Sequence, residues 1–99
     1  AVHMAGYVGL FRFTPKALEN LKELPEAMKR TRSLGEQMGV RVIGIWVTMG
    51  RYDVVGIADA PDDKTAARFA LAIASNGLVT TETMRALSEE EFAQVVAKL

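Results

Sequence analysis

Cysteine is absent from the 99-residue chain, and His3 is its single histidine. Without cysteine the chain has no disulfide, thiol nucleophile or thiolate metal site. The scarcity of histidine removes the side chain that most often acts as acid or base near neutral pH, and the commonest ligand of transition metals and haem iron. We therefore expect no bound metal, no cofactor and no histidine-based catalytic centre.

The beginning of the chain, Ala1-Val2-His3-Met4, resembles what an expression tag leaves behind. We expect residues 1–3 to be an expression remnant and Met4 to be the native start. Residues 4–99 then form a single domain, which is an ordinary size for one hydrophobic core. If residues 1–3 are a remnant, the native sequence has no histidine at all.

Neither sign of charge dominates, because 12 lysines and arginines balance 12 aspartates and glutamates. A neutral chain has no overall field that attracts nucleic acid or an anionic membrane surface. No apolar run approaches the ~20 residues of a membrane-spanning helix, and no signal peptide is visible. We expect a cytoplasmic protein with no nucleic-acid partner and no membrane partner.

Residues 42–58 contain two apolar, β-branched runs that meet at Gly50-Arg51. This pattern predicts a β-hairpin. A glycine in the first turn position suits a two-residue type II′ turn, because glycine adopts positive φ without a Cβ clash. The opposed pairs that this turn predicts are Met49 and Tyr52, Thr48 and Asp53, Val47 and Val54, and Trp46 and Val55.

Both faces of the predicted hairpin are apolar, so both need cover. Helices that follow the first, third and fourth strands can cover one face of the sheet. The other face would expose a larger apolar patch than soluble monomers usually tolerate. We therefore predict a homodimer that buries this face, or a larger oligomer built from such dimers. The face left for the partner is predicted to carry Val42, Trp46, Val55 and Ile57.

Capping and turn residues set the bounds of the other elements. Proline is expected to interrupt the first helix, because it lacks an N–H and disfavours helical geometry in the residue before it, here Leu24. The predicted elements are a strand at 7–13, a helix that begins at Thr14-Pro15, breaks near Pro25 and ends at Gly39, a helix from Asp62 to Asn76-Gly77, a strand at 78–87, and a last helix opened by a capping box of Ser88 and Glu91.

The predicted order of elements is β-α-β-β-α-β with an extra C-terminal helix. This order is typical of an α+β, ferredoxin-like fold, in which a four-stranded antiparallel sheet carries helices on one face. Connections that do not cross, with right-handed crossovers, place the first and third strands in the centre of the sheet.

Three residues at the hairpin, Gly50, Tyr52 and Asp53, resemble the glycine, tyrosine and aspartate signature of the GYD family. The turn at 60–63 and the strand at 81–86 fit as well, and the likeness covers the chain from Tyr7 onward. Leu78 departs from the pattern, since similar proteins often carry asparagine there. The resemblance implies a ferredoxin-like domain of the dimeric α+β barrel kind with no established activity. Relatives of that wider architecture include cofactor-independent oxygenases, isomerases, haem enzymes and ligand-sensing domains.

Five residues are candidates for a site on or beside the sheet. Tyr52 and Asp53 offer a donor and an acceptor beside the turn, although they could equally satisfy backbone groups and pack across the strands. Arg12 and Arg85 interrupt strand faces and could bind a carboxylate or phosphate, or simply pair with nearby carboxylates. Trp46 could anchor an interface or line a pocket.

The sequence favours a homo-oligomeric domain that is structural or binds a small ligand in the cleft beside the sheet. The alternative is a small cofactor-independent oxygenase or isomerase that uses Tyr52, Asp53 and an arginine. The fold alone does not decide between these, because one architecture supports many functions.

Overall fold

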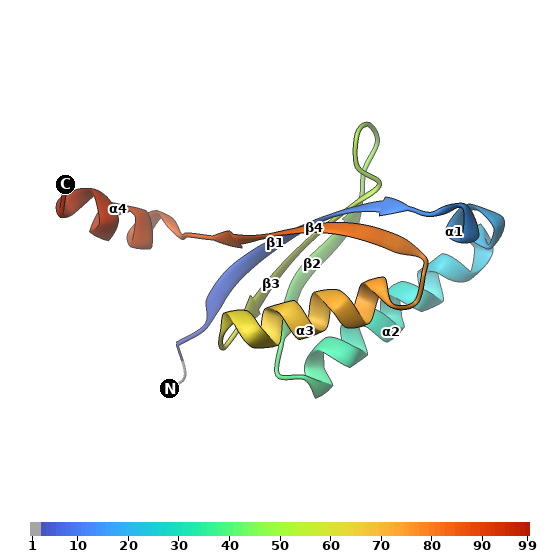
Figure 1. The fold of residues 1–99 in the computed structure, drawn as a ribbon, viewed down its shortest axis with the longest axis horizontal. Coiled ribbons are helices and arrows are strands. Elements are labelled where there is room, and N and C mark those ends of the chain that lie inside the picture. Colours follow the sequence, from blue (N-terminus) through green and yellow to red (C-terminus); the bar gives the residue numbers. More distant parts are fainter. Residues whose placement is uncertain (1–2) are drawn as a thin grey trace.

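The computed structural model describes residues 3–99, so the first two residues of the expected remnant lie outside the described chain. The elements follow the predicted order (Figure 1). The strands are β1 (Ala5–Phe13), β2 (Arg41–Val47), β3 (Val54–Ala60) and β4 (Val79–Ala86), and the helices are α1 (Pro15–Glu19), the 3-10 turn η1 (Leu21–Glu23), α2 (Leu24–Gln37), α3 (Asp63–Ala74) and α4 (Glu89–Ala97).

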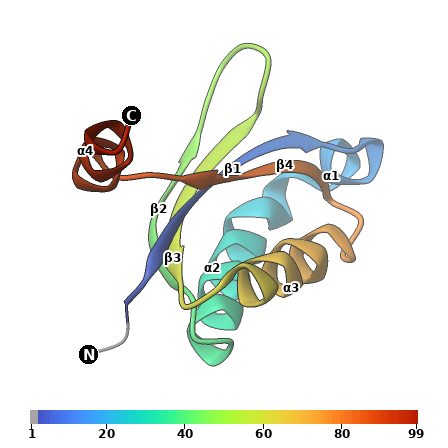
Figure 2. The same cartoon turned by 60° about the vertical axis from the view of Figure 1, so that its left-hand side comes forward.

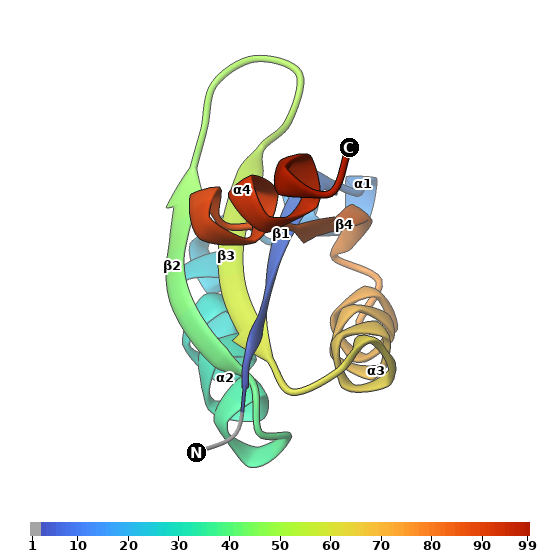
Figure 3. The same cartoon turned by 90° about the vertical axis from the view of Figure 1, so that its left-hand side faces the viewer.

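The four strands form one antiparallel sheet in the order β2-β3-β1-β4. This topology confirms the predicted α+β, ferredoxin-like fold with the first and third strands in the centre. Helices α2 and α3 lie against one face of the sheet (Figures 2 and 3). Within residues 3–99 the sheet does not close into a barrel, and its opposite face has no helix over it (Figure 1).

The first helical segment is broken, as predicted, but the break precedes the proline. Thr14 caps α1, where its hydroxyl accepts from the Ala17 amide at 3.3 Å. The chain leaves helical geometry at Asn20, and Pro25 lies in the first turn of α2. The prediction that Leu24 is displaced from helical geometry was wrong, because its φ and ψ are −62° and −39°. A proline in the first turn of a helix lacks only an N–H that has no helical partner there.

The predicted pairing of β2 with β3 is confirmed at Val47 with Val54, and the two-residue turn was wrong. Residues 48–53 instead form a loop, which projects beyond the sheet (Figure 1). The Thr48 amide donates to the Asp53 carbonyl at 2.9 Å, and the Thr48 hydroxyl donates to the Tyr52 carbonyl at 2.7 Å. These bonds keep Thr48 opposite Asp53, as predicted. They close a loop over residues 49–52 instead of a two-residue turn.

Gly50 has a φ of +118°, and a Cβ placed there would meet nothing within 4 Å. Its requirement for glycine is therefore conformational. We expect Gly50→Val to lower the free energy of unfolding by about 1 kcal/mol or more, because a β-branched residue resists positive φ. Urea denaturation measures the change. The control is Met49→Val, which adds a β-branched residue to the same exposed loop. An unchanged midpoint in Gly50→Val would contradict the assigned loop geometry.

A β-bulge in β2 shifts the pairing between Val42 and Gly44, so that Ile43 is the extra residue. Val42 pairs with Ala58 and packs against the core under the helices. The prediction that Val42 belongs to the face left for a partner was therefore wrong. An extra residue in a strand reverses the face on which all residues to one side of it lie. The alternation of apolar residues in the sequence does not show where such a residue occurs.

The core lies between the sheet and the two helices, and small residues allow the layers to approach closely. Gly35 of α2 is buried, and a Cβ there would lie 3.1 Å from the Val42 side chain and 3.2 Å from the Phe69 ring. Phe69 thus links α3 to α2 at this end of the domain. The buried cluster consists of Ala5, Tyr7, Val40, Ala60, Ala66 and Phe69.

Helix α4 continues beyond β4, away from the sheet and the other helices (Figure 1). The predicted capping box is confirmed: the Ser88 hydroxyl accepts from the Glu91 amide at 3.1 Å, and the Glu91 carboxylate accepts from the Ser88 amide at 3.0 Å. Within residues 3–99, α4 has no buried residue. The expectation that it also covers the sheet was wrong, since only two residues join it to β4. Its exposed apolar side chains are Phe92, Val95, Val96 and, just beyond the helix, Leu99.

Candidate functional site

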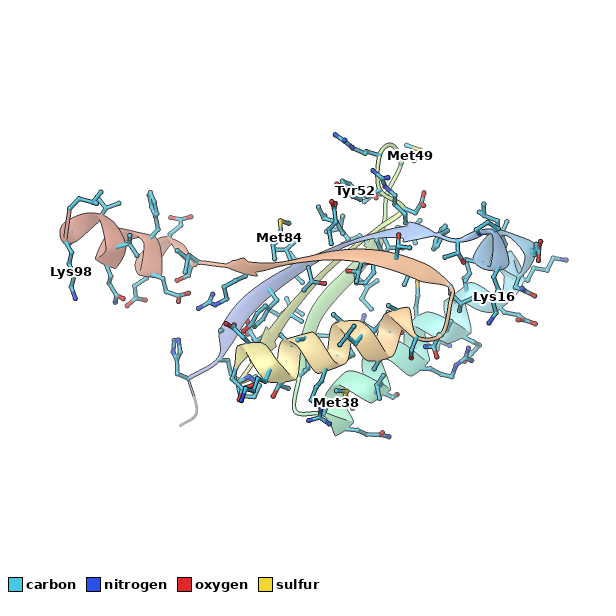
Figure 4. All side chains as sticks on the ribbon, in the orientation of Figure 1. Lys16, Met38, Met49, Tyr52, Met84 and Lys98 are labelled. Atoms are coloured by element: carbon cyan, nitrogen blue, oxygen red, sulfur yellow. The ribbon has the colours of Figure 1, made fainter. Side chains whose placement is uncertain are left out.

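The face of the sheet opposite α2 and α3, here called the open face, carries a continuous apolar patch. Directly paired residues share a face, and the pairs Leu10 with Val55 and Val8 with Ile57 lie opposite the face that contains Tyr7. Figure 4 shows Met84 pointing away from the helices on this side. The open-face patch consists of Val8, Leu10, Trp46, Val55, Ile57 and Met84.

Trp46 lies across the open face of β2. A Cβ placed on Gly44 would come within 2.3 Å of the Trp46 ring, so the indole covers that glycine. The tryptophan nevertheless keeps 52% of its surface exposed. A large aromatic ring that is ordered against backbone and still half exposed is well suited to anchor an interface.

A polar cluster connects the hairpin loop to β1 and β4 at one end of the open face. The Arg12 guanidinium lies 5.0 Å from the centre of the Tyr52 ring and donates to the Arg51 carbonyl at 3.1 Å. The Tyr52 hydroxyl donates to the Glu82 carboxylate. That bond raises the pKa of Tyr52, because loss of the proton would put two negative charges side by side. Tyr52 therefore contacts Arg12 and Glu82, whereas the sequence had paired it with Met49.

Asp53 connects the same loop to the backbone of β1. Its carboxylate accepts from the Phe13 amide at 2.8 Å, and its own amide donates to the Phe11 carbonyl at 2.8 Å. Both bonds satisfy main-chain groups of β1 at the point where its pairing with β3 ends. Of the two readings of Asp53, the geometry favours the structural one.

Arg85 lies on the other face of the sheet from Arg12. It pairs with Tyr7 across the strands, and its guanidinium is 5.7 Å from the centre of that ring. Arg85 also forms an ion pair with Glu91 at 3.0 Å, while the Tyr7 hydroxyl donates to Asp63 at 2.5 Å. The hydrogen bond to Asp63 is the main reason why the pKa of Tyr7 is raised. Arg85 thus links the helix face to α4.

The five predicted residues do not form one pocket. Arg12, Trp46 and Tyr52 belong to the open face and its loop end, Asp53 binds the backbone of β1, and Arg85 lies on the helix face. A cavity of about 1000 Å³ lies on the helix side of the sheet, and in the described chain none of these five residues lines it. The oxygenase or isomerase alternative, which needs Tyr52, Asp53 and an arginine around a substrate, therefore gains no support from this geometry.

Sequence reasoning missed two contributors. Glu82 was only one of the nearby carboxylates that could pair with an arginine, although its place on β4 opposite Leu10 puts it on the open face, diagonally across from Arg12. The cavity was missed entirely. Its signal is the facing pair Gly9 and Gly56 in the centre of the sheet, where the floor is covered by the Phe11 ring rather than by side chains of its own.

Across residues 3–99, Asp, Glu and His are not gathered in threes or more as a metal site requires. Over the same residues, each helix is too short or too polar to cross a membrane.

The cap of α4 makes this helix sensitive to acid. The amide of Ser88, and then Arg85, hold the pKa of Glu91 below its usual value. A lowered pKa stabilises the fold above the ordinary glutamate pKa, and the contribution is lost as the pH falls through the folded-state pKa. We expect residues 89–97 to lose helical 13Cα shifts between pH 6 and about pH 3.

Two variants test this explanation of the acid response. Glu91→Ala should reduce the helical shifts of α4 already at pH 6, because both the reciprocal cap and the Arg85 pair are removed. Glu90→Gln, which changes a neighbouring exposed carboxylate without a cap bond, should titrate like the wild type. If α4 keeps its helical shifts at pH 3, its stability does not depend on this cap.

The fold and the open face define an α+β domain with an exposed apolar sheet face. The GYD domain family matches the chain over residues 7–96. The chain is also 34% identical, over 97 residues, to a protein of Thermus thermophilus named "Glutamine synthetase and cystathionine beta-lyase binding protein", and the alignment covers 97% of this chain and 99% of that relative. The chain therefore belongs to the GYD domain family, as the resemblance implied.

The structure gives each of the three signature residues a position in the hairpin loop. Gly50 supplies the positive φ, Tyr52 connects the loop to β4 through Glu82, and Asp53 connects it to β1. In this chain the three signature residues therefore set the conformation of the loop at 48–53 and its hydrogen bonds to the sheet.

Proposed function

We propose that this protein is a homo-oligomeric, cytoplasmic binding protein whose copies bury their open-face patches against one another and whose assembly recognises partner enzymes. The observation that carries the proposal is the open-face patch itself. Six apolar residues from all four strands lie on one side of the sheet with no helix over them in residues 3–99. Soluble monomers rarely leave such a patch uncovered.

The total surface supports a partner of substantial size. The accessible surface of the chain is 6975 Å², whereas a compact monomer of this mass would expose about 5500 Å². The radius of gyration is 14.6 Å, against about 13 Å for a compact domain of 100 residues. The excess surface exceeds the roughly 800 Å² that each partner buries in a stable interface. One copy alone is thus less compact than its size predicts.

The relative's name supports recognition of other proteins. That protein is named for binding glutamine synthetase and cystathionine beta-lyase, and we infer that this chain binds enzymes of the same kind. The open face is assigned to self-association, so we assign enzyme binding to α4, where exposed apolar side chains follow one another along a single helix. Its side chains Phe92 and Val95 are 60% and 52% exposed and lie on a capped helix, which suits insertion into an apolar groove.

The test combines binding and mass measurements on the purified chain. Biolayer interferometry against the glutamine synthetase and the cystathionine beta-lyase of the source organism measures enzyme binding, and light scattering measures the mass of the assembly. Phe92→Ser should weaken enzyme binding by roughly tenfold or more, as expected for an aromatic anchor, and leave the mass unchanged. The matched control is Leu71→Ser, which removes an exposed apolar side chain from α3.

Three outcomes would contradict the proposal. A wild-type chain that binds neither enzyme would remove the inferred partners. A monomeric wild-type chain would remove the self-association. A Phe92→Ser variant that loses mass instead of enzyme affinity would assign α4 to the interface between copies.

A further inference from the structure

A cavity of about 1000 Å³ lies between the sheet and the helices α2 and α3. Residues of β1 and β3 line its floor and residues of α2 and α3 line its walls. Figure 3 shows that these two helices lie on the same side of the sheet. The lining of the cavity extends along β1 from Tyr7 to Phe13, a length of about 20 Å. Residues from each side are Gly9, Phe11 and Gly56 on the floor, Leu34 on α2, and Ala70 and Ile73 on α3.

Small residues on the helices leave the space open, since Ala27 and Ala70 contribute little to the walls. On the floor the facing pair Gly9 and Gly56 has no side chains, and the Phe11 ring covers it, 2.6 Å from a Cβ placed on Gly9 and 3.5 Å from one placed on Gly56. Among residues 3–99 no large side chain is completely buried. Protein interiors are normally close-packed, and the lining of an empty space loses dispersion contacts. The volume lies at the upper end of the range that small-molecule sites occupy.

The charged residues that line the cavity come from α1, η1 and the first half of α2. They are Lys16, Glu23, Glu26, Lys29 and Arg30, and all five are exposed, so their charges lie at the rim. Lys29 is paired with Glu26 at 3.4 Å. Lys16 donates to the Asn76 carbonyl at 3.1 Å, which uses one of its three N–H donors. Lysine and arginine therefore outnumber glutamate among the rim charges that have no ion pair in the described chain.

We propose that this cavity binds an elongated amphiphile of the medium-chain carboxylate class, with its alkyl chain along β1 and its anionic head at the rim beside Lys16. The alkyl chain supplies the apolar volume that the small residues leave open. The carboxylate remains at the solvent-exposed end, where desolvation is small and the lysine can donate to it. The site is on the opposite side of the sheet from the open-face patch, so it is independent of the proposed self-association.

Decanoate, kept below the concentration at which it forms micelles, is the probe. Isothermal titration calorimetry should show binding to the full chain, weaker binding of decanol, and the weakest binding of decylamine, whose charge is reversed. Ala70→Phe fills the cavity from α3 and should lower decanoate affinity by roughly tenfold or more. The ligand and the added ring would compete for the same volume, and the surrounding side chains cannot move aside without a cost in free energy. The matched control is Ala67→Phe, the same substitution at an exposed position of the same helix, which should bind decanoate like the wild type.

A second measurement does not depend on the folding of Ala70→Phe. In the wild type, decanoate should shift the amide resonances of Phe11, Gly56 and Ala70 and leave the indole resonance of Trp46 in place. Lys16→Glu should remove the preference for decanoate over decylamine while decanol binding persists. Failure of decanoate to bind, or shifts centred on Trp46, would overturn the proposal. Loss of self-association in a Trp46 variant, with decanoate binding retained, would leave the cavity assignment intact.

Discussion

Replacing Trp46 with aspartate is expected to convert the assembly into single chains at micromolar concentration. The indole occupies the part of the open-face patch on β2, and burial of a carboxylate there without a partner costs several kcal/mol. A twofold interface contains the substitution twice, so the cost is incurred twice for each contact. Light scattering should therefore fall from at least two chains to the 10.8 kDa of one.

Two further observations make this test specific. Met49→Asp introduces the same charge at a fully exposed position of the hairpin loop, outside the patch, and should leave the mass unchanged. Trp46 is the single tryptophan of the sequence, so its emission reports the open face alone. Emission typical of a buried indole is expected in the assembly. A wild-type chain that is monomeric and emits like water-exposed tryptophan would contradict the predicted interface.

Asp53→Ala should lower the free energy of unfolding by roughly 2 kcal/mol. The variant leaves the amide of Phe13 without its acceptor, and hydrogen bonds to charged groups contribute about 1.5–3 kcal/mol. The loop at 48–53 would lose a hydrogen bond to β1. In a domain of this size, each kcal/mol corresponds to a shift of about 4–8 °C in thermal midpoint, so calorimetry can resolve the change.

The matched control is Asp59→Ala at the other end of β3. Asp59 pairs with an exposed Arg41 at 3.7 Å, and such surface pairs usually contribute less than about 1 kcal/mol. A larger loss in Asp59→Ala than in Asp53→Ala would show that the signature aspartate does not have the structural role assigned to it.

The elements that local chemistry determines could be predicted from the sequence. The side chain of Asp62 caps α3 at the Thr65 amide, and Gly39 and Gly77 have positive φ where the preceding helices end. The turn centred on Gly50-Arg51 also predicted the pairing of Trp46 with Val55, although the loop there is longer than the predicted turn. Each of these depends on a few neighbouring residues, whose preferences are readable without knowledge of the rest of the chain.

Features that depend on long-range geometry could not be predicted in the same way. The bulge at Ile43 leaves no mark in the apolar pattern, yet it moves Val42 to the helix face. Arg12 and Arg85 were grouped by type, and only the register of β1 with β4 shows that they lie on opposite faces. The cavity lies between the sheet and the helices α2 and α3, and the amphipathic pattern of either helix does not encode how it packs over the sheet.

The order of the strands also decides how the backbone meets solvent. Within residues 3–99, β2 and β4 are the outer strands, and each presents a row of main-chain N–H and C=O groups that has no strand beside it. On β2 the bulge at Ile43 disturbs that row, which hinders edge-to-edge pairing. On β4 the register with β1 is unbroken from Val79 to Ala86. The two edges are therefore unequal, and an added strand, whether from another protein or from an aggregating copy, would extend the sheet from β4.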